Sequence, residues 1–493
     1  MNHAAPHVAI GARKIAPYLF LGQTVSLCAE CLAPVPTKVI EEDGAVYFQK
    51  RCRSHGIQKV LISTDPAYYR RCLDWVKPGD RPMDFQTRIA EGCPYDCGLC
   101  PDHEQHSCLA IIEVNETCNL TCPVCFANSA PDRPGTRSLA EVEAMLDALV
   151  ASEGEPDLVQ ISGGEPTLHP QIIDILQAAK ARPIRHLMLN TNGIRIARDK
   201  AFVAELATLK PGFEVYLQFD SLNPEALKAI RGADLTRIRQ QALENLQEAG
   251  ISTTLVAVIR KGLNDHEVGA IIDHALGWPC VRGVTFQPIQ DAGRNEGFDP
   301  ARDRTVLSDI RSRIVASGGP FGEADLIPLP CNPESICVAY GLRQGRQVQP
   351  ITGLFPKEVL LAELPNSVTF EKFPALRQRM FDFFSLTNVD AVAGERLEAL
   401  FCCFPEIEVP ERIGYGDLFR VAISEFLDPH NFCLSRVKRS CVHFVTPEGQ
   451  IVPFDTYNLF YRDDAAAARR AGSLVARAAQ LVPARSTSKG APE

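Results

Sequence analysis

No stretch of the 493 residues approaches the run of about 18 apolar residues that a membrane-spanning helix needs. The chain also has no surplus of positive charge, because its formal net charge is −9 and binding to duplex nucleic acid needs clustered cations. Its first residues, MNHAAPHVAIGARK, lack the basic end and apolar stretch of a secretory signal. We therefore expect a cytoplasmic protein with no transmembrane segment and no nucleic-acid partner.

Cysteine, by contrast, is abundant. The 18 cysteines fall mostly into tight C-x2-C and C-x3-C groups, which suits metal or iron–sulfur ligation in a reducing compartment better than a disulfide framework. Hydrophobic residues make up 45% and charged residues 23% of the chain, which is ordinary for a soluble globular protein. The length allows about two to four domains.

The most informative stretch is residues 111–127, IIEVNETCNLTCPVCFA, in which a strand-like apolar run leads into Cys118, Cys122 and Cys125. Three thiolates on one tight loop can each bind one iron of a 4Fe-4S cluster, whereas most such clusters have four cysteine ligands. A missing fourth ligand leaves one iron open to a small molecule. The alternatives are unrelated cysteines or a zinc knuckle, but zinc knuckles favour paired C-x2-C units.

An N-terminal module is predicted from two further ligand pairs. Cys28 and Cys31 precede a strand-like hairpin, and Cys52 follows it in the segment CRSHG. The fourth ligand is either His55 or Cys72. This layout is that of a zinc ribbon or a rubredoxin site, where four ligands replace a core too small to fold alone. Buried free cysteines are the alternative, and the spacing does not separate mononuclear iron from zinc.

A second C-x3-C-x2-C group lies just before the first. It comprises Cys93, Cys97 and Cys100, and Cys108 is near enough in sequence to be a fourth ligand. Because this group sits in a loop rich in proline and glycine, we assign it to a closed auxiliary 4Fe-4S cluster, with a zinc site as the alternative.

From residue 110 to about residue 290, strand and helix patterns alternate. Strand-like runs occupy residues 110–114, 157–161, 186–190, 214–219, 252–259 and 282–288. One intervening helix begins at a capping box formed by Ser138 and Glu141. This alternation predicts a parallel sheet in a partial (β/α)6 barrel, with its active face at the carboxyl ends of the strands.

Polar residues follow several of these strands. The second strand leads into SGGEPT, where glycines allow the backbone to approach a ligand closely and Glu165 offers a carboxylate to an ammonium group. Strand-end capping is the alternative for the later polar residues. The candidates at the strand ends are Gly163, Gly164, Glu165, Asn190, Asn192, Gln218 and Asp220.

The C-terminal part adds Cys331, Cys337 and Cys441, which could meet in space and hold a second auxiliary cluster. We expect residues 291–300 to form a loop across the barrel mouth, and the tail from Asp464 to be a frayed helix and disorder. The expected units are a metal-stapled module (1–85), an auxiliary iron–sulfur loop (86–109), a barrel core (110–320), an α+β cluster-binding extension (321–463) and an Ala/Arg-rich tail (464–493).

The triplet followed by Phe126 resembles the signature of radical S-adenosylmethionine (SAM) enzymes. The resemblance implies that Cys118, Cys122 and Cys125 hold a 4Fe-4S cluster whose open iron binds SAM, with Phe126 beside it. It also implies that Gly163, Gly164 and Glu165 contact the amino group of SAM. The strand ends at Asn190, Asn192, Gln218 and Asp220 match where relatives hold its ribose and methionine parts.

The whole set of motifs is similar to a narrower group, which includes the archaeal tetraether lipid synthase and hydroxymethylpterin methyltransferases. These share the N-terminal module, CPYDCGLCP, CNLxCPVCFA and a final CVH…PFxxYN motif. That last motif has a cysteine in relatives where this chain has Asp455. The fourth ligand of the C-terminal cluster is thus open between Asp455 and Cys433, unless the cluster is altered.

The resemblance implies a transferase that uses its cluster to split SAM into methionine and a 5′-deoxyadenosyl radical, which abstracts hydrogen from a substrate C–H bond. Carbon–carbon bond formation or methylation of a lipid or pterin-type small molecule would follow, with ferredoxin or flavodoxin as electron donor. The protein supplies binding, orientation and exclusion of water. The alternative is a non-catalytic iron–sulfur or zinc electron carrier, which needs no Gly-Gly-Glu segment or polar strand ends.

Overall fold

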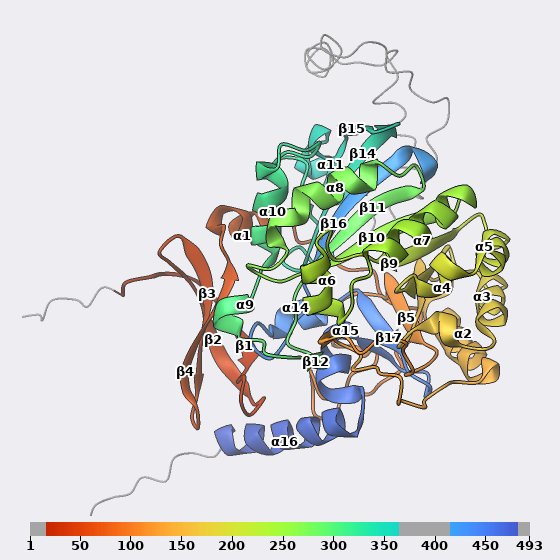
Figure 1. Cartoon of the computed structure of the whole chain (residues 1–493). Coiled ribbons are helices and arrows are strands. Elements are labelled where there is room, and N and C mark those ends of the chain that lie inside the picture. Colours follow the sequence, from red (N-terminus) through yellow and green to blue (C-terminus); the bar gives the residue numbers. More distant parts are fainter. Residues whose placement is uncertain (1–15, 364–414, 482–493) are drawn as a thin grey trace, which may run out of the picture.

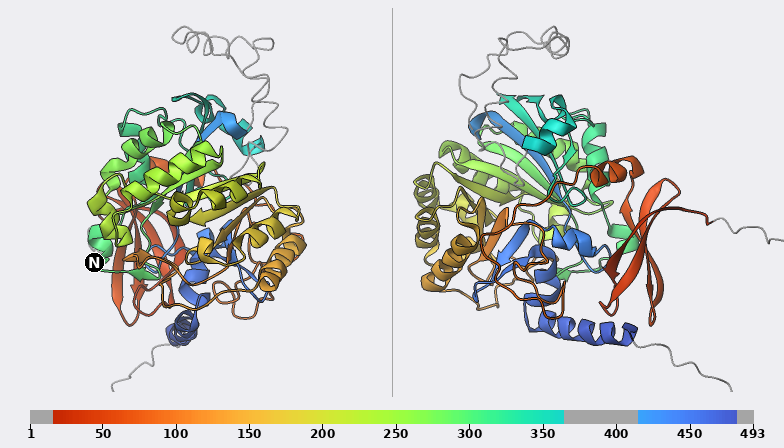
Figure 2. Two further views of the ribbon diagram at one scale, coloured as in Figure 1. Left: turned by 45° about the vertical axis from the view of Figure 1, so that its right-hand side comes forward. Right: turned by 180° about the vertical axis from the view of Figure 1, so that it is seen from behind.

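The computed structural model describes residues 16–363 and 415–481 (Figure 1). A small antiparallel sheet at the N-terminus stands beside a large mixed sheet, and helices cover the outer face of the large sheet (Figures 1 and 2). Cys402 and Cys403 lie outside the described residues.

The N-terminal sheet has the strand order β1-β2-β3-β4 and is antiparallel throughout. Asp43 and Gly44 join β2 and β3, and both have positive φ angles (51° and 75°), as a tight two-residue hairpin turn requires. The strands are β1 (Leu19–Leu27), β2 (Pro34–Glu42), β3 (Ala45–Cys52) and β4 (Gly56–Ser63), followed by the helix α1 (Pro66–Leu73).

Six parallel strands form the centre of the large sheet, and they confirm the strands expected from the sequence within about one or two residues. Their order is β5-β7-β8-β9-β10-β11. These strands are β5 (Leu109–Glu113), β7 (Leu158–Ser162), β8 (His186–Thr191), β9 (Phe213–Gln218), β10 (Ser252–Ile259) and β11 (Val281–Pro288).

Helices connect these strands and pack their apolar sides onto the sheet in one continuous core. The expected capping box at the start of α2 is confirmed, because the backbone N–H of Glu141 donates to Ser138 and the Glu141 carboxylate accepts from the Ser138 N–H. The helices are α2 (Leu139–Glu153), α3 (Ile172–Lys180), α4 (Ile194–Arg198), α5 (Lys200–Ala207), α6 (Pro224–Arg231), α7 (Thr236–Glu248), α8 (Val268–Leu276), α9 (Pro300–Asp303) and α10 (Leu307–Ala316).

The C-terminal part does not form a separate α+β unit. It extends the same sheet at both edges, since β16 pairs in parallel with β11 and β17 pairs in parallel with β5. The result is one 12-stranded sheet. The added elements are β13 (Ile327–Pro328), β14 (Ile336–Gln344), β15 (Gln347–Pro350), α11 (Lys357–Glu363), β16 (Leu418–Ser424), α14 (Leu434–Lys438), β17 (Val442–Val445), β18 (Ile451–Pro453) and α15 (Phe454–Thr456).

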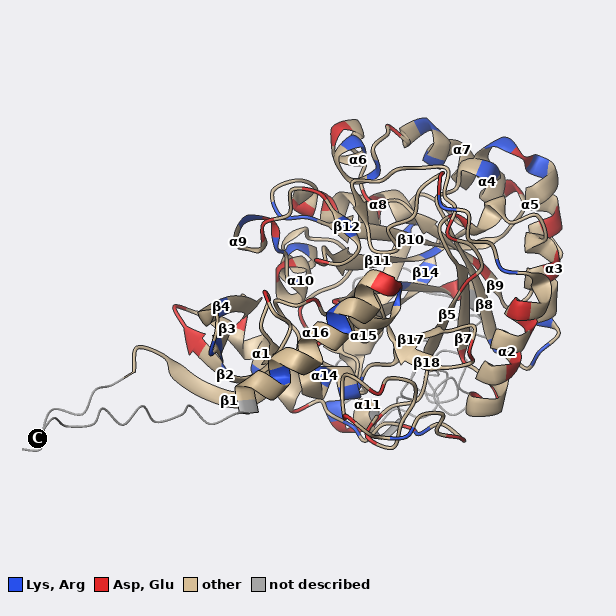
Figure 3. Ribbon diagram, turned by 90° about the horizontal axis from the view of Figure 1, so that it is seen from below, with Lys and Arg blue, Asp and Glu red and all other residues tan. Residues whose placement is uncertain are grey.

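The helix expected in the tail is α16 (Asp464–Leu481). Ser473 of α16 is buried and donates a hydrogen bond of 2.6 Å to the carbonyl of Leu32, and its oxygen lies 2.8 Å from the Tyr95 hydroxyl. The helix therefore packs against both the residues after β1 and the loop that carries Tyr95, and Figure 3 shows that α16 extends to β1. Over the described residues, none of the helices is long and apolar enough to span a membrane.

Candidate active site and metal centres

The loop that carries Cys118, Cys122 and Cys125 follows the carboxyl end of β5. Val124 and Cys125 form the short strand β6 (Val124–Cys125), which pairs with β12 (Arg294–Asn295). The segment 291–300, expected to cross the barrel mouth, therefore packs on the cysteine loop.

Contacts from β12 and its preceding glycine fix the cysteine loop. The Arg294 side chain donates to the carbonyls of Cys122 and Ser129. At Gly293, an added Cβ would stand 2.4 Å from the carbonyl oxygen of Cys125. Only glycine therefore allows the two segments to lie so close.

The glycine pair after β7 holds the other side of the same loop. Gly164 N–H donates to the carbonyl of Asn115 at 2.8 Å, and Glu165 N–H donates to the carbonyl of Thr117 at 2.9 Å. A Cβ at Gly163 would lie 2.4 Å from Asn115 Oδ1, and one at Gly164 would lie 2.3 Å from Thr117 O. Side chains at either position would push the cysteine loop away from the strand ends.

A cavity opens where these segments meet the sheet. It is lined by Cys125 and Phe126 of the cysteine loop, by Gly163 and Gly164, and by the strand-end residues Asn190 and Gln218. The Asn190 side chain donates to Ser162 Oγ at 3.2 Å, while its Oδ1 is buried and has no hydrogen-bond partner. One residue of the lining thus carries a side-chain acceptor without a hydrogen-bond partner.

The position of Glu165 differs from the expectation that its carboxylate would contact an ammonium group of the ligand. The side chain is buried and does not line the cavity. Its carboxylate accepts from Thr191 Oγ1 at 2.6 Å, Thr167 Oγ1 at 2.7 Å and the Asn192 N–H at 2.8 Å. Glu165 therefore ties the loops after β7 and β8 together, and Asn192, whose side chain bonds Asn119, is also absent from the lining.

Asp220 is likewise buried, and its carboxylate binds the side chain of Arg231. Arg231 was not identified from the sequence. Burial favours the neutral acid, but two bonds of 2.7 Å from Arg231 and one of 3.0 Å from Arg239 hold the pKa of Asp220 below its usual value. Arg231 lines the cavity and lies beside Cys122. Its only sequence signal is its place at the end of α6, just before Gly232.

The thiols of the triplet are partly shielded from solvent. Burial raises the pKa of Cys118 to about 12 and also raises the pKa of Cys122, which the Arg231 cation partly offsets. Thiols of this kind bind metal only with release of their protons.

The N-terminal ligands converge as expected, and the fourth is His55. The ligand atoms of Cys28, Cys31, Cys52 and His55 all lie within 4.8 Å of one another. His55 Nδ1 is 3.4 Å from the sulfur of Cys28 and 3.5 Å from that of Cys52. Cys72 lies elsewhere, on α1, because the hydrophobic side of that helix packs against the core of the large sheet.

The two auxiliary groupings differ from the sequence expectation. Cys108 lies not with Cys93, Cys97 and Cys100 but with Cys331 and Cys441, whose ligand atoms are all within 4.8 Å of one another. The reason is that Cys108 directly precedes β5 and Cys441 directly precedes β17, and these strands pair in parallel.

Cys337 stays apart from Cys331 although only six positions separate them. It is the second residue of β14, where it packs beside Tyr68 and Cys72. Asp455 accepts from the backbone N–H of Leu427 at 2.6 Å, and Cys433 contacts Thr24 and Ser435. Neither residue belongs to the set of ligand atoms that Cys108, Cys331 and Cys441 form.

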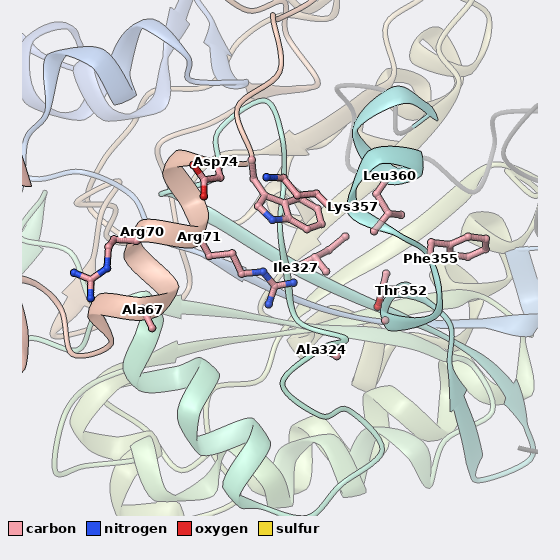
Figure 4. Close-up of a pocket in the computed structure, with 12 residues that line it drawn as sticks. Ala67, Arg70, Arg71, Asp74, Ala324, Ile327, Thr352, Phe355, Lys357 and Leu360 are labelled. Carbon is pink, nitrogen blue, oxygen red and sulfur yellow. The ribbon is translucent and has the colours of Figure 1, made fainter. Parts of the chain in front are cut away.

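A second large cavity, of about 650 Å³, lies between α1 and residues 324–360 (Figure 4). Arg70 and Arg71 of α1 and Lys357 of α11 stand around it. It contains no residue of the cysteine triplet or the glycine pair, so we place the active site at the strand ends instead.

Comparisons with known proteins agree with this placement. Residues 112–275 match the family model of the radical SAM superfamily. The chain therefore contains a radical SAM domain. Residues 20–64 match the N-terminal zinc ribbon domain of HMPTM, a range that includes Cys28, Cys31, Cys52 and His55 but not Cys72.

Among curated proteins, the chain is 28% identical over 484 residues to 7,8-dihydro-6-hydroxymethylpterin dimethyltransferase of Methanocaldococcus jannaschii, covering 90% of this chain and 94% of that protein. It is 29% identical to GTP 3′,8-cyclase of Chlorobaculum tepidum, covering 46% of this chain and 69% of the relative. It is also 31% identical to the mycofactocin maturase MftC of Mycobacterium ulcerans, over 33% of this chain and 42% of the relative.

Solved structures that resemble the chain include Streptococcus suis SuiB bound to S-adenosylmethionine, with a TM-score of 0.36 and 20% identity. The match covers 42% of this chain and 46% of SuiB. Another is anSMEcpe with bound AdoMet and a peptide, with a TM-score of 0.32 and 18% identity, covering 42% of this chain and 57% of that one.

The radical SAM domain and the similarity to a methyltransferase make this protein an enzyme that uses a 4Fe-4S cluster and SAM, and they disfavour the electron-carrier alternative. The residues fit these groups. Three cysteines share one loop, Gly163 and Gly164 line the cavity without side chains, and Asn190, whose Oδ1 has no hydrogen-bond partner, lines the same cavity.

Proposed function

We propose that this protein is a radical SAM transferase that joins a new carbon to an unactivated carbon of its substrate, by methylation or by carbon–carbon coupling. One observation carries the proposal: the chain aligns over 90% of its own length, and over 94% of the relative's, with a pterin dimethyltransferase. The similarity thus extends through the zinc ribbon and the C-terminal strands.

In this proposal Cys118, Cys122 and Cys125 ligate the catalytic cluster. When bound, the cluster and SAM supply a 5′-deoxyadenosyl radical that removes hydrogen from the substrate. Phe126, Gly163 and Gly164 shape the SAM site through backbone and ring contacts. Asn190 accepts a hydrogen bond from SAM, Gln218 lies at the next strand end, and Arg231 provides a cation for the SAM carboxylate.

The substrate would occupy the deeper part of the cavity, toward the amino ends of the strands. A buried polar network closes that end: Glu214 accepts from Arg420 at 2.9 Å and lies 3.0 Å from His186 Nε2, and Thr254 bonds the same carboxylate. Above it, Tyr216, Thr285 and Gln287 line the cavity with groups that can donate and accept hydrogen bonds.

We favour a pterin-class heteroaromatic substrate, because it is the substrate class in the name of the long relative and the polar groups above the network suit ring nitrogens and carbonyls. A lipid-type substrate is the second candidate. It is supported by the apolar wall that the C-terminal strands add to the cavity, formed by Ile336, Val338, Val421, Phe426, Val442 and Phe454.

We further propose that Cys93, Cys97 and Cys100 hold an auxiliary 4Fe-4S cluster and that a ferredoxin or flavodoxin supplies the electron. The first point is supported by the three thiols that share one loop and line one small cavity. As part of the same proposal, the zinc ribbon of residues 20–64 is a structural module, and residues 110–463 act as one catalytic unit.

The test is anaerobic reconstitution with iron and sulfide, followed by reduction with dithionite in the presence of SAM. We expect 5′-deoxyadenosine to form, and expect a hydroxymethylpterin to gain mass from SAM in liquid chromatography–mass spectrometry. Archaeal-type and bacterial lipids are assayed in parallel, so that a mass change in lipid alone selects the second candidate.

Cys122→Ala should abolish 5′-deoxyadenosine formation. Cys280→Ser is the matched control, because Cys280 is a buried cysteine packed in the core of the large sheet, away from the ligand groups. A fully loaded enzyme that forms no 5′-deoxyadenosine, or a Cys122→Ala variant that forms as much as the wild type, would contradict the proposal.

A further inference from the structure

Three cysteines that are far apart in sequence meet in the interior of the large sheet. Cys108, Cys331 and Cys441 are no more than 1% exposed, and their sulfurs all lie within 4.8 Å of one another. We propose that these three residues, with His106 as the fourth ligand, bind a single thiophilic divalent metal ion such as Zn²⁺ or Fe²⁺, and not an iron–sulfur cluster.

The distance between the sulfurs indicates that the site binds one metal ion and not a cluster of several irons. With metal–sulfur bonds of about 2.3 Å, two ligands of one tetrahedral ion stand about 3.8 Å apart. The sulfurs of Cys331 and Cys441 are 3.8 Å apart, and so are those of Cys31 and Cys52 in the zinc ribbon. In both sites the sulfur–sulfur distance therefore matches that of two ligands bound to one ion.

The cysteine triplet of residues 118–125 allows a comparison of sulfur distances within the same chain. Cysteines that each bind a different iron of a cluster must stand farther apart than ligands of one ion. Within residues 16–363 and 415–481, the sets of three or more ligand atoms within 4.8 Å of one another are the ribbon set and the set of Cys108. Cys118, Cys122 and Cys125 do not meet that distance, as expected for cluster ligands.

His106 lies next to Cys108, at the edge of the three-sulfur site. Its Nε2 lies 3.5 Å from the sulfur of Cys108, and its Nδ1 lies 2.9 Å from the Glu153 carboxylate. A histidine ligand that donates its other ring N–H to a carboxylate is the usual arrangement around a metal. The set of ligand atoms within 4.8 Å of one another holds the three sulfurs without His106, so His106 meets the site through Cys108.

A neighbouring side chain also suits a bound thiolate. The buried Gln105 side chain donates from Nε2 to the Cys108 sulfur at 3.5 Å. Hydrogen bonds to coordinating sulfurs are a common part of the surroundings of such ions.

The position of the site suggests what it does. Cys108 directly precedes β5 and Cys441 directly precedes β17, near one end of the strand order, whereas Cys331 lies between β13 and β14 at the other end. One ion would hold the two ends of the sheet together. Since Cys108 and the catalytic loop lie at opposite ends of β5, about 16 Å of strand separates this site from the cluster loop.

The test counts metal and sulfide in the purified full chain after anaerobic reconstitution with iron, sulfide and zinc. Elemental analysis gives zinc and iron, a colorimetric assay gives acid-labile sulfide, and Mössbauer spectra separate mononuclear iron from clusters. Cys331→Ser and Cys441→Ser should each lose about one metal ion per chain and no sulfide. Loss of several irons together with sulfide would overturn the proposal in favour of a cluster, and no loss at all would overturn it outright.

Cys337→Ser is the matched control, since Cys337 is buried six positions after Cys331 but packs beside Tyr68. It should keep the wild-type metal content.

If the cysteine variants do not fold, the chain with Cys28→Ser and Cys31→Ser gives the same answer without altering the site. It should retain about one mononuclear ion if the proposal holds and none if it does not. The metal count is independent of SAM cleavage, so failure of the proposed function would leave this result unaffected.

Discussion

At the scale of residues, the active site depends on buried charged side chains, each paired with a side chain of opposite charge. Asp220 fixes Arg231 beside Cys122, and Glu214 fixes Arg420 at the closed end of the cavity. Buried ion pairs of this kind are costly to break from one side, because the remaining charge is left without a partner.

We predict that Asp220→Asn lowers the free energy of unfolding by about 3 kcal/mol, as expected when a buried pair loses one partner, and weakens SAM binding. Denaturant unfolding and isothermal titration with SAM measure the two effects. Glu225→Gln is the control, since Glu225 pairs with Lys228 on the surface and such pairs contribute little. Equal stability of both variants would contradict the role given to Asp220.

A pH dependence follows from Glu214. Burial alone would raise the pKa of this carboxyl, but Arg420 and His186 hold it well below the usual value. The unfolded chain therefore takes up a proton near pH 4.3, whereas the folded chain does not, and stability present above that pH is lost as pH falls.

We predict that wild-type stability falls by about 1.4 kcal/mol more per pH unit below pH 4.3 than that of Glu214→Gln. Denaturant unfolding between pH 3 and pH 6 measures the difference. Glu248→Gln, which alters a surface pair with Lys200, should keep the wild-type slope. Parallel curves for wild type and Glu214→Gln would refute the assignment.

At the scale of elements, the cysteine loop that carries Cys118, Cys122 and Cys125 is held between two backbone segments. The glycine pair after β7 contacts it on one side, and β12 pairs with β6 on the other. Because both contacts are made by backbone, they tolerate no side chain at the points of closest approach.

We predict that Gly164→Ala lowers the rate of 5′-deoxyadenosine formation about 100-fold, since a displacement of the order of 1 Å near reacting groups can have an effect of that size. The new Cβ would stand 2.3 Å from the carbonyl oxygen of Thr117. Gly472→Ala in α16 is the control, because its Cβ would meet nothing within 4 Å. A Gly164→Ala enzyme with the wild-type rate would show that the loop does not need this contact.

At the scale of the whole molecule, the C-terminal strands and the strands of the radical SAM domain belong to one sheet. β16 covers the free edge of β11, and β17 covers that of β5. The same strands, with β14, supply the apolar wall of the cavity.

We predict that a chain ending at Pro320 is aggregated or unfolded, because β5 and β11 would become exposed edges that carry buried apolar residues such as Ile111 and Phe286. Size-exclusion chromatography and thermal melting test this. A monodisperse truncated chain with a cooperative transition would show instead that the radical SAM domain folds alone.

The sequence by itself determined what depends on local spacing. It predicted the six parallel strands, the capping box at Ser138 and a four-ligand metal module at the N-terminus, because periodicity, caps and paired ligands act over a few residues. The cysteine triplet and the glycine pair were identifiable for the same reason, since each is a short motif after one strand.

Only the tertiary structure decided the contacts between distant segments. Cys108 joins Cys331 and Cys441 because β17 pairs with β5, and Arg231 reaches Cys122 because Asp220 holds it there. Glu165 turns to Thr191 and Asn192 because two neighbouring strand ends approach one another. These arrangements depend on strand pairing and packing over long chain separations, which spacing along the sequence does not encode.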